Sequence, residues 1–169
     1  MRGISEELAI DYSGLFGRMG VELQLIKVSS VDTPSLELLR AMNHLVPQLS
    51  SSSKPLELGD LQRLIENDCV TLLVASDNET GKILGTLTLV VFPIPTGLRA
   101  WIEDVIVDSD ARGKGIGKEL VRTAVEFAES QGAKSVDLTS RPSRVEANAL
   151  YLGMGFGLRE TNVYRYVWS

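Results

Sequence analysis

Residues 112–118 combine glycines and basic side chains in a pattern suited to binding an anion. The segment reads Arg-Gly-Lys-Gly-Ile-Gly-Lys, and it separates a short apolar run from a long amphipathic stretch. Backbone N–H groups at the start of a helix have no partner within the helix, and the helix dipole adds positive charge there. Glycine lets a phosphate approach that backbone closely. The pattern therefore predicts a strand, a loop and a helix, with a diphosphate-bearing ligand at the loop.

Two common phosphate-binding loops do not fit this segment. A Walker A loop needs Gly-Lys followed by a hydroxyl that binds magnesium, but here Lys118 is followed by Glu119 and Lys114 by Gly115. The dinucleotide fingerprint Gly-x-Gly-x-x-Gly fails by one residue, because Lys118 stands where the third glycine belongs. A nucleotide-binding regulator is therefore disfavoured.

Three motifs together resemble the GNAT superfamily of N-acetyltransferases. Residues 112–117 match its Arg/Gln-x-x-Gly-x-Gly/Ala loop, and residues 102–107, Ile-Glu-Asp-Val-Ile-Val, look like its strand beside the acyl thioester. Downstream, residues 148–151 and the pair Gly155-Phe156 look like its Asn-x-x-Tyr and Gly-Phe signature. The resemblance implies an α/β single domain with a mixed, mostly antiparallel sheet of six or seven strands, flanked by about four helices.

The resemblance also implies roles for individual residues. Acetyl-CoA would be the acyl donor, with its diphosphate on the glycine loop. A backbone N–H of the central strand, near Val105 or Ile106, would polarise the thioester carbonyl. Tyr151 would be the general acid toward the leaving thiolate, and Asn148, on the same helix face, would hold the pantetheine. The residues expected to bind the cofactor are Val105, Ile106, Val107, Arg112, Gly113, Lys114, Gly115, Ile116, Gly117, Lys118 and Asn148.

Two acidic residues on the central strand are candidates for the general base. A lysine-like amine with a pKa of ~10.4 needs about 4.6 kcal/mol to be neutral at pH 7. Successive strand residues face opposite sides, so either Glu103 or Asp104 should face the pocket unless a bulge intervenes. We favour Glu103 as the catalytic base, acting through water. The alternative is that both acids only orient loops by hydrogen bonding.

The surrounding sequence must supply the elements that position these residues. The expected strands cover residues 21–28, 71–76, 83–92, 101–107, 135–139, 156–159 and 163–168. Asp77–Gly81 is predicted as a hairpin loop. An apolar stripe after the glycine loop predicts a core-facing helix capped at Gly132, so the strands before and after it should be parallel.

Three further segments carry helix signals. Thr33 is predicted as an N-cap, with Pro34 at the first helical position. Residues 47–55, rich in serine and bounded by prolines, are expected to form a loop, and residues 59–66 a second helix. A capping box that begins at Ser143 predicts the short helix that carries Tyr151.

Composition bounds the class of protein. The chain has 169 residues, so we expect an irregular arm over residues 1–20 and a single N-acetyltransferase domain over residues 21–169. The one cysteine, Cys69, is expected to be a buried hydrophobe, and the absence of disulfides suits a reducing cytoplasm. A net charge of −5 argues against nucleic acid as a partner, and no apolar run is long enough to span a membrane. The lone histidine, His44, is expected at a helix C-terminus, and no clustered ligands imply a metal.

Several alternatives stay open from the sequence. Residues 102–105, Ile-Glu-Asp-Val, are reminiscent of glucosamine-6-phosphate N-acetyltransferases, but four residues do not decide between a small molecule and a peptide amine. A non-catalytic acyl-CoA-binding sensor would keep the glycine loop without needing Tyr151. Arg141 and Arg144 would touch a ribose phosphate or, as we favour, form a solvated helix cap. Alternating aromatic residues near the C-terminus predict either a half-buried strand or an edge used in a homodimer.

Overall fold

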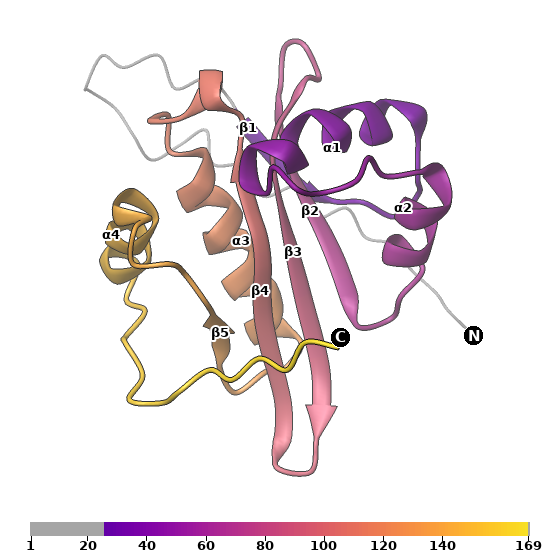
Figure 1. The fold of residues 1–169 in the computed structure, drawn as a ribbon. Coiled ribbons are helices and arrows are strands. Elements are labelled where there is room, and N and C mark those ends of the chain that lie inside the picture. Colours follow the sequence, from indigo (N-terminus) through magenta and orange to yellow (C-terminus); the bar gives the residue numbers. More distant parts are fainter. Residues whose placement is uncertain (1–25, 169) are drawn as a thin grey trace.

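The computed structural model describes residues 26–168, which form one sheet with helices on both faces (Figure 1). The strands are β1 (Ile26–Ser30), β2 (Val70–Asp77), β3 (Ile83–Ile94), β4 (Gly97–Val107) and β5 (Val136–Leu138). The helices are α1 (Leu36–Leu49), α2 (Leu58–Ile65), α3 (Ile116–Ser130) and α4 (Val145–Gly153), and a 3-10 turn, η1 (Ser109–Ala111), follows β4. The expected arm over residues 1–20 and the first part of the strand over 21–28 lie outside the described residues.

The sheet confirms the predicted mixed topology. Its strand order is β1-β2-β3-β4-β5, and every neighbouring pair is antiparallel except β4 and β5. The parallel pair lies on either side of α3 in the chain, as the strand–helix–strand pattern predicts. Within residues 26–168 the sheet has five strands, not the six or seven expected.

Side-chain alternation on β2 shows how the two helical layers are held. Leu73 and Ala75 belong to the core cluster that contains the apolar face of α3. Leu72 and Val74, on the opposite face, pack with residues of α1 and α2 such as Leu61. The sheet therefore lies between α3 on one side and α1 with α2 on the other, as Figure 1 shows.

Helix α3 matches its prediction closely. Its predicted stripe is buried at Leu120, Val121, Ala124 and Ala128. Gly132, just past the C-terminal end, has φ of 83°, a left-handed conformation that ends helices and favours glycine. Burial of this face fixes the helix, and with it the glycine loop, onto the sheet.

Helix α1 begins and ends later than predicted. Its N-cap is Ser35, whose Oγ accepts a hydrogen bond from the Leu38 N–H at 3.1 Å, so the prediction of Thr33 and Pro34 is wrong by two residues. The helix also continues through Pro47 to Leu49, where a loop was expected. A proline in the last turn removes only one intrahelical hydrogen bond at its own nitrogen, and burial of the helix face outweighs that loss.

Strand β3 continues to Ile94, two residues past the expected end at residue 92, and so it includes Pro93. The Val91 N–H donates to the Cys69 carbonyl on the β2 side of the strand, at 2.8 Å. The nitrogen of Pro93, two residues on, faces the same side, beyond the point where β2 begins. Pro93 therefore costs the ladder no hydrogen bond. Cys69 itself is exposed, so its prediction as a buried hydrophobe is wrong.

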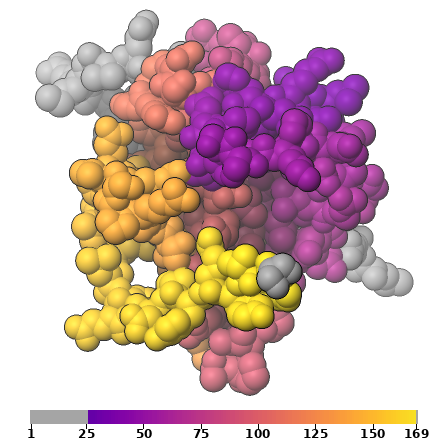
Figure 2. Space-filling model, viewed as in Figure 1, coloured from indigo at the N-terminus to yellow at the C-terminus, as the bar shows by residue number. Residues whose placement is uncertain are grey.

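The C-terminal segment, residues 157–168, forms no strand, so the two final strands predicted from its alternation are wrong. A strand needs a neighbouring strand to receive its backbone hydrogen bonds, and no described strand pairs with this segment. Figure 2 shows an open gap between this segment and the surface beside it. The predicted capping box also fails, because α4 begins at Val145 and its N-cap, Arg144, makes no side-chain capping hydrogen bond to the helix.

A buried aspartate joins the end of β4 to α1. Asp108 is 1% exposed, and its Oδ2 lies 3.1 Å from Nε2 of His44 and 3.8 Å from Nζ of Lys82. One turn further along α1, the Gln48 Oε1 accepts a hydrogen bond from the Ser109 N–H at 2.9 Å. The expectation that His44 lies at a helix C-terminus is wrong, because α1 continues to Leu49 and has no basic residue in its last turn. With Gln48, His44 ties α1 to the residues between β4 and the glycine loop.

The buried aspartate makes stability depend on pH. Burial by itself would raise the pKa of Asp108, but hydrogen bonds from the Asp110 N–H and His44 hold it below its ordinary value. A depressed folded-state pKa contributes stability above the unfolded-state value and loses it as the pH falls through the folded-state value. We expect Asp108→Asn to lower the free energy of unfolding at pH 7 by about 1–3 kcal/mol, with the gap to the native chain closing below about pH 4.

Urea unfolding between pH 7 and pH 3 measures this gap. Asp110→Asn, at an exposed neighbour, is the matched control and should stay within about 0.5 kcal/mol of the native chain. A gap that keeps the same size down to pH 3 would contradict the assignment of the charge to Asp108.

Candidate active site

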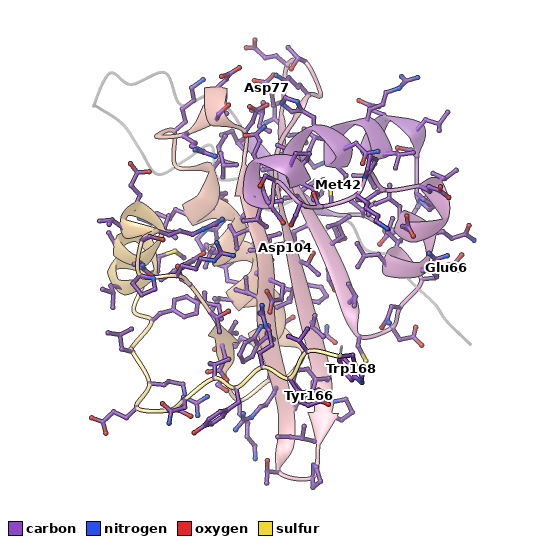
Figure 3. All side chains as sticks on the ribbon, viewed as in Figure 1. Met42, Glu66, Asp77, Asp104, Tyr166 and Trp168 are labelled. Atoms are coloured by element: carbon purple, nitrogen blue, oxygen red, sulfur yellow. The ribbon has the colours of Figure 1, made fainter. Side chains whose placement is uncertain are left out.

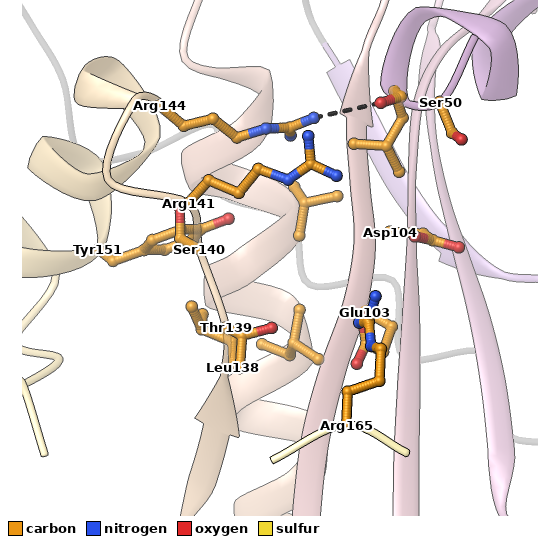
Figure 4. A pocket seen from close by; sticks show the side chains of 13 residues that line it. Ser50, Glu103, Asp104, Leu138, Thr139, Ser140, Arg141, Arg144, Tyr151 and Arg165 are labelled. Atoms are coloured by element: carbon orange, nitrogen blue, oxygen red, sulfur yellow. Dashed lines mark hydrogen bonds between the residues drawn. The ribbon is translucent and has the colours of Figure 1, made fainter. Parts of the chain in front are cut away.

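A cavity opens where β4 and β5 part. The two strands pair only from Ala100 with Val136 to Ile102 with Leu138. Beyond that point β4 continues to Val107, whereas the chain after β5 turns away toward α4. The space between them is a cavity of about 390 Å³, lined by β4, the loop after β5, α4, the end of α1 and the C-terminal segment (Figure 4).

A β-bulge shapes the β4 wall of this cavity. Thr86 on β3 pairs with Ile106 and Thr88 pairs with Glu103, so two residues of β4 lie opposite one residue of β3. Asp104, in the bulge, has φ of 49° and is the one described non-glycine residue with positive φ. The bulge breaks the alternation of faces, and both Glu103 and Asp104 line the cavity. The sequence predicted that only one of these two acids would face the pocket unless a bulge intervened. The bulge is present, and both acids face the pocket.

Glu103 has a fixed partner inside the same strand. Its Oε1 accepts a hydrogen bond from the Nε1–H of Trp101 at 2.6 Å. The two side chains share a face because they are two positions apart on a strand. This contact orients the carboxylate and leaves its second oxygen for another donor.

Tyr151 forms part of the opposite wall. It projects from α4, lines the cavity and packs edge-to-face against Phe156, with ring centroids 5.9 Å apart. Burial raises the pKa of the Tyr151 phenol above its ordinary 10.0, and the positive charge of Arg144 opposes part of that rise. The phenol is therefore protonated at neutral pH and can donate a proton into the cavity.

Asn148 lies on α4 but is not among the residues that line the cavity. Its Nδ2 donates to the Arg141 carbonyl at 3.0 Å, which ties α4 to the loop after β5. In this structure Asn148 therefore holds the loop that forms one wall of the cavity.

The glycine loop begins just past the far end of β4. Gly113 and Gly115 have φ of 76° and 79°, conformations that other residues rarely adopt, and Gly115 is the N-cap of α3. Ile116, 1% exposed, anchors the first residue of the helix in the core. Arg112 turns back toward β4, where its Nε donates to the Val107 carbonyl at 3.3 Å. The loop thus presents the N-terminus of a 15-residue helix to solvent, the arrangement that binds phosphate groups.

Three arginines also line the cavity between β4 and β5: Arg141, Arg144 and Arg165. Arg144 donates from Nη2 to the Leu49 carbonyl at the end of α1, at 3.4 Å, as the dashed line in Figure 4 shows. For Arg141 and Arg144 the sequence favoured a solvated helix cap over contact with a ribose phosphate. It gave no signal for Arg165. Only the path of the C-terminal segment brings Arg165 to the cavity.

Within residues 26–168 no group of three or more His, Cys, Asp or Glu side chains is arranged to hold a metal ion. None of the helices in that part of the chain is both long and apolar enough to cross a bilayer.

The fold and the site define a class of acyl-transferring α/β domain, and comparison with known proteins identifies the family. Residues 37–156 match the acetyltransferase (GNAT) family, so the chain belongs to that family. The family predicted from the three sequence motifs is thereby confirmed.

Individual relatives agree with this assignment. Glucosamine 6-phosphate N-acetyltransferase of Trypanosoma brucei brucei is 33% identical over 144 residues, which cover 83% of this chain and 92% of that protein. N-acetyltransferase 8B of Homo sapiens is 29% identical over 115 residues, and the match spans 67% of this chain but only 50% of the relative. An aminoglycoside acetyltransferase from an uncultured soil metagenomic sample shares the fold, with a TM-score of 0.75 at 22% identity over 85% of this chain and 96% of that one.

The bulge makes a prediction about stability. A left-handed backbone costs a non-glycine residue without local hydrogen bonding roughly 1–2 kcal/mol relative to glycine. We therefore expect Asp104→Ala to be less stable than Asp104→Gly by about 1 kcal/mol, measured by urea unfolding. At the neighbouring Glu103, where φ is not positive, the order should reverse, with the glycine variant less stable by about 0.5–1 kcal/mol. An alanine variant at Asp104 that is more stable than the glycine variant, as expected at Glu103, would show that the Asp104 backbone is not left-handed.

Proposed function

We propose that the protein is an acetyl-CoA-dependent N-acetyltransferase that moves an acetyl group directly from the thioester to a primary amine of a small molecule or peptide. One observation carries this proposal: a single cavity has two carboxylates on one wall and a protonated phenol on the other. Transfer to an amine needs one group to accept a proton and another to donate one.

The glycine loop supports acetyl-CoA as the donor. Coenzyme A supplies an activated thioester and carries a diphosphate. In this proposal the backbone N–H groups at the start of α3 bind the diphosphate, and Lys114 and Lys118 add positive charge beside them. The edge of β4 from Val105 to Val107, which pairs with no residue of β5, runs from the cavity toward this loop, and in this proposal it offers backbone groups to the pantetheine arm.

The bulge supports a role for the β4 backbone in stabilising the developing oxyanion. A bulge leaves its extra residue out of the regular ladder of hydrogen bonds. The proposal therefore assigns a backbone N–H at Val105 or Ile106 to the thioester oxygen, where negative charge grows during attack. The fixed position of β4 in the sheet means that this donor needs no rearrangement.

The two acids support deprotonation of the incoming amine. Glu103 is our preferred base, because its hydrogen bond with Trp101 orients it while one oxygen stays available. Asp104 is a second acid in the same cavity. Tyr151 then protonates the leaving thiolate from the opposite side, which keeps the acid and the base on separate walls.

Release of free thiol from acetyl-CoA against a panel of amines tests the proposal. The panel contains amino acids, polyamines, aminoglycosides, glucosamine 6-phosphate and short peptides with free N-termini. We expect release with one acceptor class, and Tyr151→Phe should lower kcat about 100-fold with little change in the KM for acetyl-CoA. Tyr164→Phe, at a residue 86% exposed and outside the cavity, is the matched control.

Two outcomes would overturn parts of this proposal. Full activity in Tyr151→Phe would remove the phenol from the mechanism. Binding of coenzyme A in calorimetry, without release from any amine, would favour a non-catalytic acyl-CoA-binding module instead.

We also propose that the protein forms a homodimer through the C-terminal segment. Six large apolar residues in this segment are 72% to 92% exposed: Leu158, Val163, Tyr164, Tyr166, Val167 and Trp168. Figure 3 shows Tyr166 and Trp168 on the part of the C-terminal segment that crosses in front of the sheet. The outer side of β5 has no neighbouring strand among the described residues. In a two-fold symmetric dimer, each copy would cover the exposed apolar residues and the unpaired side of β5 of the other copy.

Light scattering measures this directly. The native chain should show about twice the chain mass of 18.5 kDa, and a Tyr166→Ser, Trp168→Ser double variant should show a single chain mass. Leu152→Ser, which changes an exposed apolar residue on α4, is the control and should remain dimeric. A single chain mass for the native protein at micromolar concentration would end the proposal.

A further inference from the structure

We propose that the acceptor amine carries a phosphate group and that Arg141 and Arg165, with Arg144 beside them, recognise it. This inference rests on the proposed acetyl transfer and adds the chemical class of the acceptor. The three guanidinium groups reach one cavity from three parts of the chain: the loop after β5, the N-cap of α4 and the C-terminal segment. Figure 4 shows Arg141, from the loop after β5, and Arg144, from the start of α4, extending side by side toward β4, with Arg165 next to Glu103.

The arginines of this cavity form no ion pair with a carboxylate of the described residues. Among residues 26–168, no carboxylate oxygen lies within 4.0 Å of the guanidinium of Arg141, Arg144 or Arg165. Of the other described arginines, Arg63, Arg122 and Arg159 each form an ion pair with an aspartate or glutamate. The remaining three described arginines, Arg40, Arg99 and Arg112, form none either, but they do not line this cavity. The chain has 22 acidic and 17 basic residues, yet in this cavity three arginines outnumber two carboxylates, Glu103 and Asp104, and form an ion pair with neither. The positive charge is left for a ligand.

The cofactor's own phosphates are assigned elsewhere. The cations of the glycine loop, Arg112, Lys114 and Lys118, do not line this cavity, and the three cavity arginines do not belong to the loop. The protein therefore has two separate sets of cations. One set lies at the N-terminus of α3, and the other lies beside the reacting groups.

The cavity also separates charge of opposite sign. Glu103 and Asp104 lie on the β4 wall, where an ammonium group would be attracted before it loses its proton. Arg141 and Arg144 reach the same space from the opposite wall, whereas Arg165 enters from the C-terminal segment on the side of Glu103 (Figure 4). A molecule with an amine at one end and an anion at the other matches this arrangement in both sign and order.

Phosphate is the anion that fits this group best. A guanidinium forms two parallel hydrogen bonds with phosphate oxygens, and three guanidinium groups suit a group with more than one negative charge. The cavity volume of about 390 Å³ lies at the lower end of the range for small-molecule sites. The acceptor class is therefore a small phosphorylated primary amine.

Matched pairs of acceptors test this inference. The pairs are glucosamine with glucosamine 6-phosphate, and ethanolamine with phosphoethanolamine. We expect kcat/KM for the phosphorylated member to exceed that of its partner at least tenfold in both pairs, or in the one pair whose carbon skeleton the cavity accepts. Arg141→Gln and Arg165→Gln should each reduce that preference about tenfold, without a matching rise in the KM for acetyl-CoA.

Arg40→Gln is the matched control. Arg40 is an exposed arginine on α1 outside the cavity, so its replacement removes the same charge and should leave the preference at its native value. Arg141→Lys keeps the charge but loses the planar fork, and it should recover only part of the preference.

Three results would overturn the inference, and they differ from failure of the proposed function. Equal use of both members of each pair would remove the phosphate from recognition while leaving acetyl transfer intact. A rise in the KM for acetyl-CoA in Arg141→Gln, with the preference unchanged, would assign the arginines to the cofactor. If no amine is acetylated, the proposed function fails, and calorimetry with coenzyme A present still decides: phosphoethanolamine and glucosamine 6-phosphate binding no better than their unphosphorylated partners would refute the anion site.

Discussion

The cavity of the candidate active site exists because two parallel strands, β4 and β5, diverge. β4 and β5 share only three residue pairs, and a bulge in β4 follows directly. Had the ladder continued, main-chain hydrogen bonds would fill the space that the cavity occupies. Because it stops, the wall of β4 presents side chains and an interrupted backbone to a space that α4 and the end of α1 enclose. The chemistry depends on this divergence more than on any one side chain.

Distant packing holds the separated strands in place. The apolar face of α3 anchors the glycine loop from below, through residues such as Ile116 and Leu120 that are essentially inaccessible to water. The end of α1, which forms one wall of the cavity, is tied to the first residues after β4 by Asp108 and Gln48. The cavity and the glycine loop therefore share one support.

Local signals in the sequence predicted the parts of the fold that are governed locally. The glycine loop, the stripe of α3 and the parallel pair followed from glycine conformation, helical periodicity and chain connectivity. The bulge could not be predicted, because it depends on the pairing register between β3 and β4, which the strand pattern leaves open. The contact between His44 and Asp108 joins residues 64 positions apart, and no local pattern specifies it. The C-terminal segment shows the opposite case: its alternation is that of a strand, but the described chain provides no strand to pair with it.

Pro93 protects an otherwise vulnerable edge. β3 extends four residues beyond its last pairing with β2 at Val90. Over these four residues, which are mostly apolar, the side of β3 that faced β2 is an unpaired strand edge. Bare edges of this kind recruit strands from other molecules and begin aggregation. Pro93 has no N–H to offer on that side, and the turn at the tip is closed by Lys134, whose Nζ donates to the Thr96 carbonyl at 2.5 Å. Pro93 thus allows a long hairpin and at the same time discourages β-pairing between molecules. Its replacement by valine would first reduce solubility at high protein concentration.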